Sequence, residues 1–119
     1  VHPSAVVSGY SQLGEGSVVM ANSVINPSAI LGESCIVNSG STIDHDCILR
    51  SGVHISPGAN LGGGVEVGSK SWVGIGASIK QYLKIGEESI VGAGAVVVAD
   101  VHDRTTVVGV PARPIKRAD

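Results

Sequence analysis

The chain carries an aliphatic residue at every sixth position over most of its length. An α-helix repeats near 3.6 residues and a strand at two, so neither produces an unbroken period of six. A chain that turns a corner every six residues, and points one aliphatic side chain inward each time, does produce it. The sequence therefore predicts a β-solenoid built from six-residue repeats, here called hexads. The series is Val1, Val7, Leu13, Val19, Ile25, Leu31, Val37, Ile43, Leu49, Ile55, Leu61, Val67, Val73, Ile79, Ile85, Val91 and Val97.

The hexads share an internal order that predicts a triangular coil. The first residue is aliphatic, the second is often Gly or Asn, and the fifth is small, as in residues 31–36 and 91–96. We expect three hexads per coil, with residues two to four forming each corner, where Gly or Asn tolerates a positive φ. Residues 1–102 then form about six coils of an all-β parallel helix. The repeat stops after His102, so residues 103–119 are predicted to be a C-terminal tail that packs back on the helix.

Composition narrows the classes of function. The formal net charge is −2, which argues against a nucleic-acid-binding protein. The sequence has no apolar run long enough to span a membrane and no signal peptide, so we expect a cytoplasmic protein without membrane contact. Cys35 and Cys47 both take the fifth place of a hexad. They are twelve residues apart, whereas stacked neighbours would be eighteen apart, so we expect free thiols in a reducing compartment.

One group of polar residues interrupts a surface otherwise built of Gly, Ser and Ala: Asn38, Asp44, His45, Asp46 and His54. Histidine is the side chain best suited to proton transfer near neutral pH. His45 falls in the turn part of its hexad, so its imidazole should project outward. The flanking acids favour the imidazolium, and a carboxylate bonded to one ring nitrogen leaves the other free. The alternative is a solvated turn histidine beside two solvated acids.

The chain resembles the hexapeptide-repeat left-handed β-helix acyltransferases. Within them it is most similar to the sialic acid O-acetyltransferase and nucleotide-linked amino-sugar N-acetyltransferase group. Residues 38–54, the Val-Gly-Ile-Gly-Ala run at 73–77 and the Gly-Val-Pro-Ala-Arg run at 109–113 carry this resemblance. It implies a left-handed helix, acetyl-CoA as donor, and a homotrimer with active sites in the clefts between subunits. Members of the group usually begin with a small Rossmann-like domain, whereas here the first residue already starts the first hexad; we expect no such domain, which leaves the identity of the acceptor open.

The resemblance also implies a role for individual residues. His45 would be the general base, and Asp46 would increase its basicity. Asn38 and Asp44 would contact the acceptor. The residues expected to bind acetyl-CoA are His54, Ile75, Ala93 and Gly94, with Arg113 and Lys116 of the basic tail meeting its phosphates.

The implied mechanism is direct transfer of the acetyl group to the amine of a nucleotide-linked amino sugar. His45 takes the proton of the attacking amine, and a nearby backbone N–H stabilises the oxyanion. The same base would serve the hydroxyl of a sialic acid, which is the second hypothesis.

Two hypotheses from other classes remain on this fold. A γ-type carbonic anhydrase needs about three converging metal ligands. That family has a pair of histidines five residues apart, whereas His45 and His54 are nine apart. We therefore expect no metal. A non-enzymatic scaffold or ice-binding prism would need no Asp-His-Asp cluster, and an ice-binding face would need a ladder of threonines. Thr occurs only at positions 42, 105 and 106.

Overall fold

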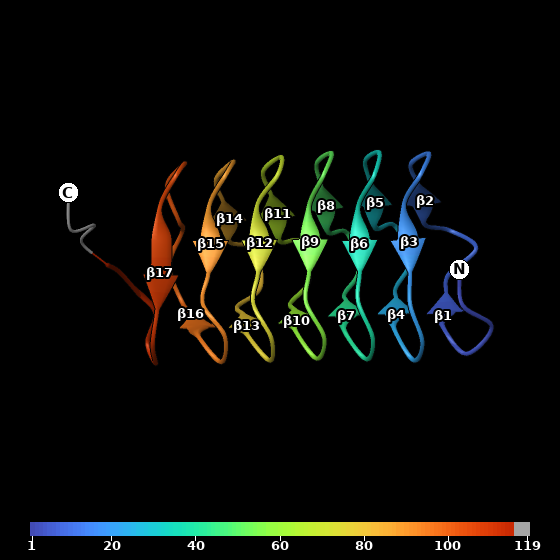
Figure 1. Cartoon of the computed structure of the whole chain (residues 1–119). Coiled ribbons are helices and arrows are strands. Elements are labelled where there is room, and N and C mark those ends of the chain that lie inside the picture. The colour runs from blue at the N-terminus through green and yellow to red at the C-terminus, as the bar shows by residue number, and fades with distance from the viewer. Residues whose placement is uncertain (116–119) are drawn as a thin grey trace.

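The computed structural model describes residues 1–115, which form a three-sided prism of stacked, very short β-strands (Figure 1). Each side of the prism is one sheet. Sheet A contains β1 (Val6–Val7), β4 (Val24–Ile25), β7 (Thr42–Ile43), β10 (Asn60–Leu61), β13 (Ser78–Ile79) and β16 (Val96–Val97). Sheet B contains β2 (Gln12–Leu13), β5 (Ile30–Leu31), β8 (Ile48–Leu49), β11 (Glu66–Val67) and β14 (Lys84–Ile85). Sheet C contains β3 (Val18–Val19), β6 (Ile36–Val37), β9 (His54–Ile55), β12 (Trp72–Val73), β15 (Ile90–Val91), β17 (Thr106–Val108) and β18 (Arg113–Pro114).

The strand register confirms the prediction of an all-β solenoid with three hexads per coil. Val24 pairs in parallel with Thr42, and Asn60 with Ser78, so each coil advances by eighteen residues. In β1 to β16 the second residue of each strand is the aliphatic first residue of a hexad, and from Val19 to Val97 all of these are buried. Burying one such side chain contributes about 1.5–3 kcal/mol. Rows of aliphatic side chains therefore form the core along the whole prism.

The two cysteines lie inside this core as free thiols. Cys35 Sγ donates to the Arg50 carbonyl at 3.1 Å, and Cys47 Sγ donates to the Gly62 carbonyl at 3.2 Å. Burial raises the pKa of both thiols, that of Cys47 to about 11. Neither cysteine is thus placed or ionised to act as a nucleophile.

The corners show why the hexads are rich in glycine. The fourth residue of each hexad from Gly16 to Gly94 has a positive φ, including 61° at Asp46. Glycine in the second place meets a different need, close approach of neighbouring coils. A Cβ added to Gly68 would lie 2.4 Å from the backbone nitrogen of Glu87, which no real side chain allows. The sequence analysis assigned positive φ to the corner as a whole, and the structure separates the two requirements.

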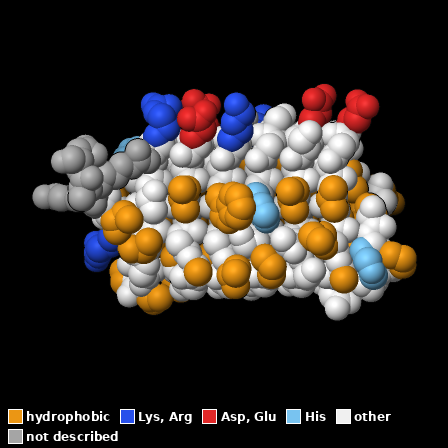
Figure 2. Space-filling view, viewed as in Figure 1, with side chains coloured by type: hydrophobic (Ala, Val, Ile, Leu, Met, Phe, Trp, Pro, Cys, Tyr) orange, Lys and Arg blue, Asp and Glu red, His pale blue; other side chains and the backbone are white. Residues whose placement is uncertain are grey.

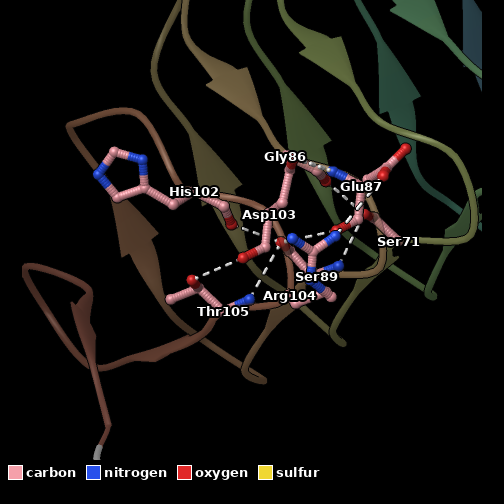
Figure 3. Close-up of polar contacts among 8 residues, drawn as sticks. All are labelled: Ser71, Gly86, Glu87, Ser89, His102, Asp103, Arg104 and Thr105. Atoms are coloured by element: carbon pink, nitrogen blue, oxygen red, sulfur yellow. Dashed lines mark hydrogen bonds and ion pairs between the residues drawn. The ribbon is translucent and has the colours of Figure 1, made fainter.

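The last coil is shorter than the others. Thr106 pairs with Ile90, so β17 extends sheet C beyond His102 after a spacing of sixteen residues. In this coil a side-chain oxygen takes the place of a backbone acceptor: Asp103 Oδ1 accepts a hydrogen bond from the Glu87 N–H at 2.9 Å (Figure 3). In the same corner, Ser89 Oγ donates to the His102 carbonyl at 2.7 Å.

The C-terminal segment then folds over the end of the prism. Strand β18 runs antiparallel to β17, with Val108 opposite Arg113. On sheet A, the Val96 N–H donates to the Gly109 carbonyl and the Ala112 N–H donates to the Val96 carbonyl. On sheet B, Asp100 Oδ1 accepts a hydrogen bond from the Lys84 N–H at 2.8 Å. The segment after β16 thus covers the final strands of all three sheets.

Candidate active site

His45 lies in corner AB, the set of turns that lead from sheet A to sheet B. Its Nδ1 is 2.9 Å from Asp46 Oδ2, and the two side chains are 50% and 63% exposed. The hydrogen bond to Asp46 raises the pKa of His45, and the negative charge of Asp44 adds to this effect. Asp44 Oδ1 in turn accepts the His45 backbone N–H at 2.7 Å and the Asn26 side-chain amide at 3.1 Å. With its Nδ1–H held by Asp46, the imidazole presents Nε2 as a proton acceptor.

Gly63, one coil above His45, provides the space in which the imidazole lies. A Cβ at Gly63 would be 2.5 Å from His45 Cε1 and 2.6 Å from Nε2. The neighbouring Gly64 N–H donates to the His45 carbonyl at 2.9 Å, which fixes the distance between the two coils. Gly63 itself is buried, and within residues 1–115 no hydrogen bond uses its N–H. Among the described residues the Gly63 N–H is therefore a donor without a partner.

The sequence analysis missed this glycine, although a signal was present. Gly62, Gly63 and Gly64 stand eighteen residues after Asp44, His45 and Asp46, so each lies directly above its counterpart in the stack. The run of three glycines could have marked the place where the imidazole needs room.

A groove lies across sheet C and corner CA, the turns that lead from sheet C to sheet A. Its volume is about 400 Å³, and most of its lining is apolar. Figure 2 shows this side of the prism, where apolar side chains follow sheet C with a histidine among them. The lining residues are Asn38, His54, Ser56, Pro57, Trp72, Gly74, Ile75, Ile90, Val91, Gly92 and Ala93. The structure thus gathers four of the predicted binding residues, Asn38, His54, Ile75 and Ala93, in one groove.

The remaining predicted residues are distributed as follows. Gly94 follows Ala93 in corner CA with φ 68°. Arg113 is exposed in β18 at the C-terminal end of the prism. Lys116 lies outside the described residues. His45, Asp44 and Asp46 are in corner AB, so a single chain does not bring the predicted base to the groove that holds the predicted acetyl-CoA contacts.

Three further observations concern the structure away from His45 and the groove. A second cavity, of about 680 Å³, lies beside the end of sheet B; its lining carries both signs of charge, including Arg50, Glu66 and Lys84. Within residues 1–115 no three His, Cys, Asp or Glu side chains of one chain gather as a metal-binding group. None of the described residues forms a helix with the length and apolarity needed to cross a membrane.

The sequence and the fold both match known hexapeptide-repeat proteins. Residues 10–45 match the family described as bacterial transferase hexapeptide (six repeats). The acetyltransferase domain of PglB from Neisseria gonorrhoeae FA1090, solved also with acetyl coenzyme A, is 46% identical with a TM-score of 0.95, and the match covers 96% of this chain and 56% of that one. PerB from Caulobacter crescentus, solved with CoA and GDP-perosamine, is 45% identical with a TM-score of 0.97, and the match covers 98% of this chain and 56% of that one.

A third structure, WeeI from Acinetobacter baumannii AYE, is 33% identical with a TM-score of 0.92 over 95% of this chain and 56% of that one. Among curated protein sequences no match is found. The chain is therefore a hexapeptide-repeat protein with the left-handed β-helix fold. Its structural neighbours include sugar N-acetyltransferases, and it spans 56% of the length of the three compared in detail.

Proposed function

We propose that this protein transfers an acetyl group from acetyl-CoA to the amine of a nucleotide-linked amino sugar. The observation that carries the proposal is the His45 imidazole, bonded through Nδ1 to Asp46 and lying in the space that the missing Cβ of Gly63 leaves. The same chemistry is named for its neighbours, since PerB is a GDP-perosamine N-acetyltransferase and the PglB domain is solved with acetyl-CoA.

The chain supplies a base and an amide donor for a direct transfer. The sugar nitrogen attacks the thioester carbonyl, and His45 Nε2 takes its proton while Asp46 stabilises the imidazolium. The Gly63 N–H donates to the oxyanion of the tetrahedral intermediate. The intermediate then expels the CoA thiolate, which receives the proton from His45, so no acyl-enzyme forms. Buried Cys35 and Cys47 take no part.

The groove in corner CA suits the donor. Its small residues, such as Gly74, Gly92 and Ala93, let an extended pantetheine arm approach the backbone closely. Arg113 lies farther toward the C-terminal end of the prism and would meet a CoA phosphate, together with Lys116. The sugar amine would reach the thioester near Asn38 and Asp44.

The proposed assembly is a homotrimer in which corner AB of one copy faces the groove of the next. One copy holds the base and the groove on different corners, so a complete site needs two copies. The outward side chains of Val18, Ile36, Trp72 and Ile90 give sheet C an apolar surface suited to such packing. Acetyl-CoA and nucleotide sugars are cytoplasmic metabolites, so the proposal also places the protein in the cytoplasm.

The test is release of free CoA thiol with a panel of UDP-, GDP- and dTDP-linked amino sugars and with sialic acids. We expect the highest turnover on an amino sugar, and a loss of about 10²- to 10⁴-fold in His45→Ala. His2→Ala, a histidine whose ring bonds Ser4 and does not line the groove, is the matched control. Turnover on a sialic acid alone would favour O-acetylation instead. Full turnover in His45→Ala, or no thiol release with any acceptor, would refute the proposal.

A further inference from the structure

Trp72 is the one tryptophan of the chain, and it lies directly against His54. The two residues are partners in the register of β9 and β12, and both point outward from sheet C. Their ring centroids are 4.0 Å apart with an angle of 31° between the planes. The Trp72 side chain thus covers one face of the imidazole while 49% of the residue remains exposed to the groove.

Asn38 completes the setting of the His54 ring. Its Nδ2 is 3.4 Å from His54 Nε2. When this amide donates, Nε2 is the acceptor and the ring proton is on Nδ1. His54 therefore has one nitrogen bonded within the chain and one N–H that can donate to a ligand carbonyl.

The surroundings of His54 favour its neutral form. Burial lowers the pKa of His54, and no carboxylate lines the groove to stabilise an imidazolium. The elements packed around the ring present Ile36 from β6, Asn38 from the turn after β6, and Trp72 from β12. His54 is the sole titratable side chain among the lining residues that the structure describes.

We infer that Trp72 is a positioning residue of the donor groove, which packs against one face of the His54 imidazole and holds the ring so that its N–H can bond a carbonyl of an acyl-thioester arm. The identity of the donor rests on the proposed function, whereas the pairing of Trp72 with His54 does not. The indole also forms an apolar wall beside Ile75 and Ile90. Because the chain has one tryptophan, its emission reports on this pair alone.

The first experiment tests the pairing in the free protein, without any substrate. A protonated imidazole quenches the emission of a stacked indole, so the emission should fall with pH, with a midpoint below the ordinary histidine value of about 6.5. His54→Gln should abolish this titration, and His45→Gln should leave it unchanged. An emission that is independent of pH, or a titration that persists in His54→Gln, would overturn the inference.

The second experiment tests the role in the reaction. Trp72→Leu should raise KM for acetyl-CoA by about three- to tenfold, the range expected for loss of one aromatic pair, with little change in KM for the acceptor. Trp72→Phe, which keeps a flat ring, should stay within about twofold of the wild type. Val6→Ala, another substitution of an exposed apolar side chain but on sheet A and outside the groove, is the matched control, and thermal melting followed by circular dichroism checks each fold.

The outcomes separate the two proposals. If Trp72→Leu turns over acetyl-CoA with the KM of the Val6→Ala control, Trp72 does not position the donor and the proposed function stands. If the wild type shows the emission titration but releases no thiol with any acceptor, the proposed function fails and the Trp72–His54 pair stands.

Discussion

The contact between Gly63 and His45 makes one substitution unusually informative. In Gly63→Ala, the new Cβ would lie 2.5 Å from His45 Cε1 and 2.6 Å from Nε2, whereas carbon atoms in contact prefer about 3.5 Å or more. The imidazole must therefore retreat by about 1 Å or rotate away from Asp46. A displacement of this size at a reacting group costs about 10²-fold in rate, or about 2.7 kcal/mol in the activation barrier.

The same substitution should leave the fold intact. Gly63 is not among the residues with a positive φ, so alanine strains no backbone angle there. The His45 ring is half exposed and can turn into solvent. Replacing glycine in a compatible conformation stabilises a protein by about 0.4–1 kcal/mol through the unfolded chain, which offsets part of the cost of moving the ring. We therefore expect a melting temperature within a few degrees of the wild type.

The assay is kcat/KM from CoA thiol release on the best acceptor, with melting followed by circular dichroism. Gly9→Ala is the control, because a Cβ there would meet nothing within 4 Å. Gly63→Ala with wild-type turnover and a native melting curve would show that the place of the imidazole does not matter for the reaction.

Three further predictions concern the same site. Asp46→Asn should move the acidic limb of the kcat/KM profile to lower pH, because the bond to Asp46 raises the pKa of His45 and only the unprotonated base works; an unmoved limb would contradict this. Cys35→Ala and Cys47→Ala should keep kcat within about twofold, whereas lost turnover in a folded variant would indicate an acyl-enzyme. The variants His45→Ala and Ala93→Trp, each inactive alone, should give about one quarter of wild-type activity when they are refolded together in equal amounts. Each proposed site takes its base from one copy and its groove from the next, and random mixing supplies both intact parts to about one quarter of the sites. No recovery would place the site within one chain.

The fold could be predicted in detail because one period controls it. A six-residue repeat determines which side chains point inward, and the eighteen-residue coil then determines which residues stack. The pairing of His45 with Asp46 was also accessible, since neighbours in a turn have few alternatives. The six-residue repeat did not predict the path of the chain after Val97. There, side-chain oxygens of Asp100 and Asp103 accept hydrogen bonds in place of backbone carbonyls, and the coil is shorter.

The parts of the site that escaped prediction depend on stacking and on ring geometry. His45 and His54 are nine residues apart, which is half a coil, so they must lie on different sides of the prism. Gly63 and Trp72 each lie eighteen residues beyond a predicted histidine, and the repeat alone could have named them. The room left by the missing Cβ and the tilt of the indole come from packing, which no periodicity encodes.

The folded-over C-terminal segment has a consequence for solubility. A stack of parallel coils ends in unpaired N–H and C=O groups, and such open edges recruit further chains in the manner of a growing fibril. In this protein the C-terminal segment forms hydrogen bonds at that end through Asp100, Gly109 and Ala112, and β18 pairs with the outer edge of β17. Shortening the chain before Gly109 would expose a template for end-to-end polymerisation, so these few residues act as a terminator for a structure that could otherwise extend without limit.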